Sequence, residues 1–186
     1  MLSYYYELPF GAGKARLKSG PMSKVFGGWA VAAIQEYQSG GPLRITVPNG
    51  LPIFNGHLRP NRVAGVPILT GPGRADFQPL NGLTGQAGDV LLNRAAFSTP
   101  AAFTFGNLGV FLPDVRAFGI RNEDISVMKK FRFLERRAFE LRGDFFNAFN
   151  RRNLGAPITD LTNPNFGRIT GQGNPRTIQL GFRLDF

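Results

Sequence analysis

The sequence predicts an all-β fold of antiparallel strands joined by irregular connections. The clearest evidence is the segment Arg176 to Phe186, where apolar and polar residues alternate with a strict period of two, as in a strand with one apolar face. Its apolar residues are Ile178, Leu180, Phe182, Leu184 and Phe186. The 186 residues also include 24 Gly and 14 Pro, which break helices, and 18 Phe, which favour strands.

Five segments have strand character. The first alternates from Leu2 to Leu8, and the second carries the apolar run WAVAAI. The third and fourth are separated by a tight turn at 134–136. We therefore predict strands at residues 1–8, 27–38, 124–133, 137–147 and 177–186.

The connection 43–123 is dominated by Pro, Gly and Asn, and its short apolar pieces, such as LRITV, show no sustained period. We predict one long loop with a helical turn near 93–97. A structureless segment of this length argues against a compact soluble domain, whereas long extracellular loops are normal in large outer-membrane barrels.

The terminal strand is long enough to cross an outer membrane, and no apolar run approaches the length of a spanning helix. The short connections after the first strand (the turn PFGAGK) and after the third fall on the same side as Phe186, as periplasmic turns do. The sequence thus predicts antiparallel strands of an incomplete transmembrane β-barrel with long irregular extracellular loops.

Charge favours one register for the last three predicted strands. Pairing Glu140 with Arg183 avoids like charges opposite each other, and the tight turn places Lys130 on the other side of Glu140. We predict a lumen-facing ion row of Lys130, Glu140 and Arg183. Lys129 falls on the apolar parity, so it requires a bulge or a side chain that snorkels to the interface.

Composition and charge limit the classes of function that the protein can have. The net charge of +10 comes from basic residues scattered along the chain without a nucleic-acid-binding motif, and excess Arg on loops facing anionic lipid or lipopolysaccharide explains it as well. The chain has no Cys, which excludes disulfides. The beginning lacks a secretory signal, so we expect a fragment of a longer, exported protein.

One motif hints at a phosphate-binding loop. Gly11, Gly13 and Lys14 have part of its spacing, but Leu8 replaces the first glycine and Ala15 replaces the hydroxyl residue that would hold magnesium. We interpret the segment as a periplasmic turn.

The other residues that could bind a metal or act as an acid or base lack the partners that such sites require. His57 is the only histidine, which excludes a two-histidine metal site. Glu140 and Asp144 share a strand face but have basic neighbours that favour structural ion pairs. Asp114 and Asp160 lie in loops without calcium-ligand spacing. We expect no enzymatic activity, no cofactor and no metal site.

Several blocks in order along the chain resemble the C-terminal barrel of TonB-dependent outer-membrane receptors, most of all the Oar-like subgroup, whose members carry a carboxypeptidase-regulatory-like domain. The blocks are YELPFGAGKARL (6–17), GGWAVAAIQEYQSGGPLRIT (27–46), LRPNRVAGVPI (58–68), NRAAF (93–97), FGNLG (105–109), FELRGDFFNAFNRRNLG (139–155) and FGRITGQGNPRTIQLGFRLDF (166–186).

The resemblance implies a barrel of about twenty-two strands, plugged by an N-terminal domain, that imports an unidentified ligand with energy from TonB. This sequence has no plug and no TonB box, so we expect contact with TonB only through a missing part of the same receptor. It also implies an outer-membrane location in a Gram-negative-type bacterium, with membrane lipid and lipopolysaccharide as neighbours. Adhesion or signalling is a further possibility in this subgroup.

The terminal strand also resembles the signal that barrel-assembly machinery recognises; it comprises Ile178, Leu180, Phe182, Leu184 and Phe186. Two alternatives stay open at this point. A soluble β-rich carbohydrate-binding or adhesion module predicts a detergent-independent monomer, and a nucleic-acid-binding protein predicts affinity that falls steeply with salt.

Overall fold

The computed structural model describes residues 1–49, 56–81, 87–134 and 137–186. The chain divides into two compact units. Unit 1 comprises Met1–Tyr37, Arg121–Arg152 and Asn174–Phe186, and unit 2 comprises Gln38–Ile120 and Asn153–Gly173. Within the described ranges, the structure contains no helix long and apolar enough to cross a membrane.

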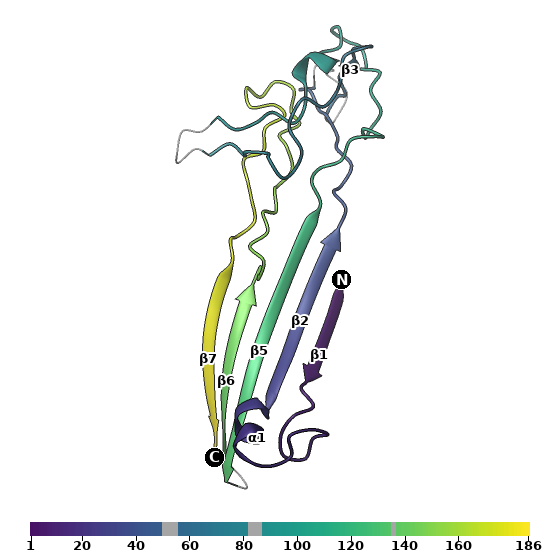
Figure 1. The fold of residues 1–186 in the computed structure, drawn as a ribbon. Coiled ribbons are helices and arrows are strands. Elements are labelled where there is room, and N and C mark those ends of the chain that lie inside the picture. The colour runs from purple at the N-terminus through teal and green to yellow at the C-terminus, as the bar shows by residue number, and fades with distance from the viewer. Residues whose placement is uncertain (50–55, 82–86, 135–136) are drawn as a thin grey trace. The chain divides into compact units, whose positions relative to one another are not determined.

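Unit 1 is built on a five-stranded antiparallel sheet in the order β1-β2-β5-β6-β7, which does not close on itself (Figure 1). The strands are β1 (Leu2–Glu7), β2 (Trp29–Gln38), β5 (Ile120–Leu134), β6 (Arg137–Phe146) and β7 (Thr177–Asp185). All five predicted strands are confirmed. The largest difference is β5, which begins at Ile120 rather than at residue 124. The predicted tight turn falls largely on residues 135 and 136, which lie outside the described ranges.

The predicted register of the last three strands is confirmed. Glu140 pairs with Arg183 on one side and with Lys130 on the other. Because side chains alternate along a strand, this pairing gathers the apolar residues of β5, β6 and β7 on one face of the sheet.

The connection between β1 and β2 contains a helix that the sequence analysis missed, α1 (Pro21–Phe26). Its signals were Pro21 in the first turn and Gly27 after the last, the usual asymmetry of helix ends. The connection folds back tightly, because a Cβ atom on Gly11 would lie 2.8 Å from the Cα atom of Gly27. Glycine is required there both by this close approach and by a φ of +107°.

Unit 2 corrects the prediction of a structureless loop at 43–123. It contains the two-stranded pair β3 (Asn61–Arg62) and β4 (Phe97–Ser98), and a 3-10 helix, Arg94–Ala96, that confirms the predicted helical turn. It also has its own apolar core. Buried members of that core are Leu43, Ile45, Val47, Leu58, Leu92, Ala96, Phe97, Leu108, Leu112, Val115, Leu161 and Phe166. These residues lie at irregular spacings, so no single period in the sequence predicts their burial.

A second, smaller cluster in unit 2 buries Phe77, Leu91, Leu154 and Ile169. The ring of Phe77 packs edge-on against Phe118, with 5.4 Å between the ring centroids. The long connection therefore forms a folded body with two apolar clusters, to which Asn153–Gly173 of the β6–β7 connection also contributes.

Candidate functional site

The five-stranded sheet has one apolar and one polar face. Phe182 on β7 lies opposite Leu141 on β6, which lies opposite Lys129 on β5. The face they share carries mostly aliphatic and aromatic side chains, and Phe182 is 81% exposed. Its charged residues include Lys129, Glu123 and, at the strand starts, Arg121 and Arg137. The other face carries Lys130, Glu140 and Arg183 and their charged neighbours.

The three residues of the predicted ion row lie side by side, but Lys130 and Arg183 form ion pairs with Asp185. Asp185 accepts a hydrogen bond from Arg183 Nε at 2.7 Å and lies 3.5 Å from Lys130 Nζ. Ala138 is the β6 residue opposite Asp185, and its small side chain leaves room for Lys130 to reach across. That the row faces a lumen stays a prediction.

Four of the five residues of the predicted assembly signal lie on β7, at one edge of the sheet, and Phe186 directly follows this strand. The apolar side chains of the signal are all exposed: Ile178 (53%), Leu180 (80%), Phe182 (81%), Leu184 (58%) and Phe186 (95%). The unpaired side of an edge strand also presents backbone donors and acceptors to another strand. Such an edge needs both an apolar environment and a pairing partner.

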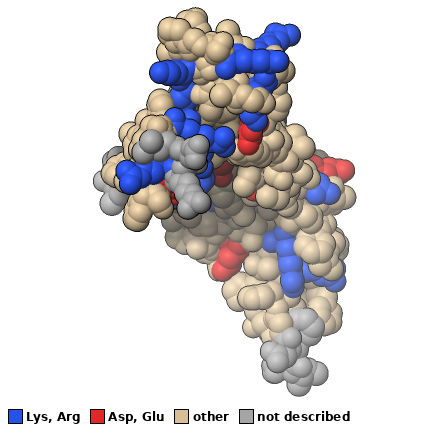
Figure 2. All heavy atoms as spheres, turned by 90° about the horizontal axis from the view of Figure 1, so that it is seen from below, with Lys and Arg blue, Asp and Glu red and all other residues tan. Residues whose placement is uncertain are grey.

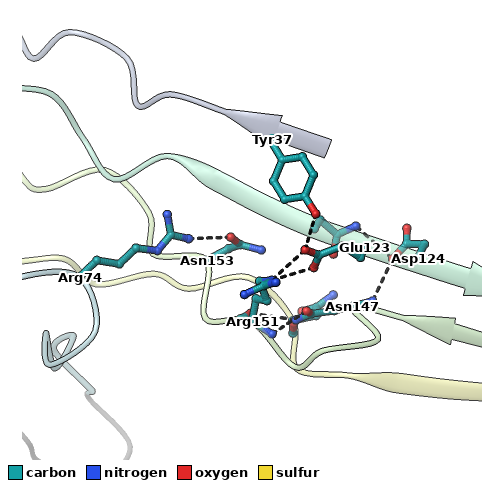
Figure 3. Close-up of polar contacts among 9 residues, drawn as sticks. Tyr37, Arg74, Glu123, Asp124, Asn147, Arg151 and Asn153 are labelled. Carbon is teal, nitrogen blue, oxygen red and sulfur yellow. Dashed lines mark hydrogen bonds and ion pairs between the residues drawn. The ribbon is translucent and has the colours of Figure 1, made fainter. Parts of the chain in front are cut away.

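A polar cluster joins the strand ends from which the long connections leave. The side chain of Glu123, near the start of β5, is 1% exposed. It accepts a hydrogen bond from the Tyr37 hydroxyl at 2.8 Å, and its two oxygens share the Arg151 Nε–H group, each at 2.9 Å from Nε (Figure 3). The hydrogen bonds and the negative charge of this carboxylate raise the pKa of the Arg151 guanidinium, because both stabilise its protonated form.

The segment after β6 wraps around this cluster through two asparagines with left-handed backbone conformations. Asn147 has a φ of 48° and Asn150 one of 50°, a region that asparagine enters more readily than most residues. The Asn147 amide donates to the carbonyl oxygens of Arg151 and Asn174, at 2.9 and 3.0 Å. Asn150 accepts a hydrogen bond from the backbone of Arg176 at 3.0 Å. These contacts tie the end of β6 to the start of β7.

Lys129 corrects a second expectation, since it neither snorkels nor occupies a bulge. It is buried, and its Nζ atom donates to the carbonyl oxygens of Lys24 at 3.0 Å, Val25 at 2.7 Å and Gly27. Carbonyls at the C-terminal end of a helix lack partners within the helix and attract cations. The lysine is thus held by the end of α1, which the sequence analysis had not predicted.

Three of the remaining candidate residues form ion pairs or hydrogen bonds within the protein. Lys14, from the phosphate-loop resemblance, pairs with Glu7 in the connection after β1. Asp144 pairs with Arg142 at 2.8 Å, as predicted for a structural ion pair. The backbone amide and the hydroxyl of Thr162 both donate to Asp160 and hold the pKa of that carboxyl below its usual value.

The last two candidate residues, His57 and Asp114, are exposed residues of unit 2. Within the described ranges, no three His, Cys, Asp or Glu side chains gather as a group that could hold a metal ion.

An antiparallel sheet with one apolar and one polar face is the construction of a transmembrane β-barrel wall. The comparison with protein families agrees: the model of the outer membrane beta barrel domain matches residues 1–179, and the chain belongs to this family. The protein is therefore located in the outer membrane. Comparisons with curated proteins and with solved structures found no match.

The absence of native cysteine makes the assignment of the two faces directly testable. In outer-membrane preparations of the full chain, we expect a charged, membrane-impermeant thiol reagent to label Arg142→Cys and Arg183→Cys. The matched variants are Leu141→Cys, next to Arg142, and Phe182→Cys, next to Arg183. Both should resist labelling because their side chains face lipid. Equal labelling within either pair would contradict the assignment.

Proposed function

We propose that this chain forms part of the wall of a TonB-dependent outer-membrane receptor that takes up an external ligand. The observation that carries the proposal is an open sheet of five strands with a polar face. Transmembrane barrels have eight or more strands, so β1 and β7 require further strands at their free edges. The ordered blocks that resemble TonB-dependent receptors support a large barrel of this kind.

The folded connection between β2 and β5 supports a role at the cell surface. In barrels of this class the long connections are extracellular, and binding residues often lie on such loops. The apolar core that this connection shares with the β6–β7 connection can hold a binding surface in one conformation. We propose that it contributes to ligand capture, while the plug and the TonB contact belong to another part of the receptor.

We assign β7 a role in assembly. Its exposed apolar row and free edge are suited to recognition by the barrel-assembly machinery, and the apolar face is suited to outer-membrane lipid and lipopolysaccharide. The location of the family in the outer membrane argues against the soluble alternative. No enzymatic step is part of the proposal.

Uptake can be tested in the bacterium that makes the protein. Cells with and without the gene would be given a panel of radiolabelled ferric siderophores, oligosaccharides and peptides, with and without a proton uncoupler. The receptor proposal expects at least one compound to enter only when the gene is present and the proton gradient is intact. Uptake that is unchanged by gene deletion, or uptake that resists uncoupling, would refute it.

A further inference from the structure

The connection between β1 and β2 has an unusual charge balance. Residues 8–28 contain Lys14, Arg16, Lys18 and Lys24 and no Asp or Glu. Lys14 pairs with Glu7, whereas the other three basic residues are exposed. Basic side chains also predominate over acidic ones in the view from below (Figure 2). The connection therefore presents a net positive surface.

The same connection exposes apolar side chains. Leu17 is 41% exposed, and α1 exposes Met22 (54%), Val25 (58%) and Phe26 (44%). Half of this six-residue helix is thus apolar and uncovered. Exposed apolar area costs roughly 25 cal/mol per Å² in water, so a cluster this dense indicates a nonaqueous neighbour.

The end of α1 is fixed to the apolar face of the sheet. Lys129 and Trp29, neighbours on this face, both donate to the Val25 carbonyl oxygen, at 2.7 and 3.0 Å. Lys129 Nζ also lies 5.2 Å from the Trp29 ring centroid and 5.0 Å from that of Phe131, which adds cation–π attraction. The exposed apolar residues of α1 therefore continue the surface that faces lipid.

The side of the membrane follows from topology. The β1–β2 connection leaves the sheet at the end where only two residues separate β5 from β6, opposite the end from which the long connections leave. Short turns of outer-membrane barrels are periplasmic. A helix at this end that combines apolar and basic residues has the composition of an interfacial anchor. Aromatic residues such as Trp29 are enriched at this depth.

We propose that residues 8–28 anchor the barrel wall in the periplasmic leaflet by binding anionic phospholipid. Met22, Val25 and Phe26 enter the boundary between headgroups and acyl chains, and Arg16, Lys18 and Lys24 bind lipid phosphates. Lys129 is the positioning residue that holds α1 at this depth. This anchor is independent of the proposed uptake function, because it requires only that the wall lies in the membrane.

Trp29, the only tryptophan, provides a direct reporter. The full chain would be incorporated into phosphatidylcholine vesicles with the same fraction of either brominated phosphatidylglycerol or brominated phosphatidylcholine, whose bromines quench tryptophan on contact. We expect stronger quenching by phosphatidylglycerol. Each neutralised basic residue should lower this preference by up to about fivefold, so Arg16→Gln/Lys18→Gln/Lys24→Gln should abolish it.

The matched control neutralises three exposed arginines outside the connection, Arg44→Gln/Arg152→Gln/Arg176→Gln, and should keep the preference. High salt should weaken the preference in the parent protein, because exposed charges are screened. Equal quenching by the two lipids, no quenching by either, or the same loss in the control variant would each overturn the proposal. Loss of uptake with the lipid preference intact would count against the receptor function only.

Discussion

Replacing Leu92 with alanine is expected to open unit 2. The Leu92 side chain is 0% exposed and belongs to the larger apolar cluster of this unit. Truncating a fully buried leucine removes its transfer free energy and leaves a cavity, which together cost about 2–5 kcal/mol. Unit 2 consists largely of irregular chain, so it has few backbone ladders to compensate for the loss.

Limited proteolysis of the full chain would measure this effect, with mass spectrometry to locate cuts between residues 43 and 119. When cleavage follows the population of the open form, a loss of 2 kcal/mol raises the cleavage rate about thirtyfold. The control is Leu69→Ala, because Leu69 is the bridge partner of Leu92 but is 47% exposed. If Leu92→Ala were cut at the parental rate, the apolar cluster would not be what holds the connection together.

The strands of the sheet could be predicted because a half-buried strand leaves a period of two in the sequence. Even the register followed, since Glu140 opposite Arg183 avoids a clash of like charges that a two-residue slip would create. The period of two is a local signal, and the pairing of charges involves only two strands. Neither depends on how the rest of the chain folds.

The core of unit 2 could not be predicted in the same way, because its members come from short pieces scattered between residues 43 and 166. The nearest signal was the alternation of Leu43, Ile45 and Val47, which is too short to distinguish a buried strand from a loop. Lys129 was misinterpreted for a related reason. Its partners are backbone carbonyls of α1, about a hundred residues earlier in the chain, and the sequence carries no pairwise mark of such contacts.

The polar cluster was also missed, although its components are ordinary. Glu123 was assigned to the end of the long loop, because the predicted strand began at residue 124, whereas β5 begins at Ile120. The asparagines of the FNAFNRR segment were the better signal, because Asn is enriched in left-handed turns. Only the folded chain brings Tyr37 and Arg151 onto the same carboxylate.

Replacing Glu123 with alanine should therefore loosen the end of the sheet from which the long connections leave. The change removes the acceptor of the Tyr37 hydroxyl and of the Arg151 guanidinium at once. Hydrogen bonds to charged groups contribute about 1.5–3 kcal/mol, so we expect a loss of about 2–3 kcal/mol in the free energy of unfolding. Arg151 is 41% exposed, so water can solvate part of the charge left behind, which keeps the loss below that of a fully buried pair.

The loss can be measured by urea denaturation of the full chain in detergent micelles, with Glu36→Ala as the control. Glu36 lies on β2 and is half-buried, so its truncation should have a small effect. A double-mutant cycle with Arg151→Ala isolates the pair, and a coupling above about 0.5 kcal/mol is expected for residues in direct contact. Additive losses would mean that Glu123 acts through Tyr37 alone. In that case Glu123→Gln, which keeps an acceptor for the hydroxyl, should restore the parental stability.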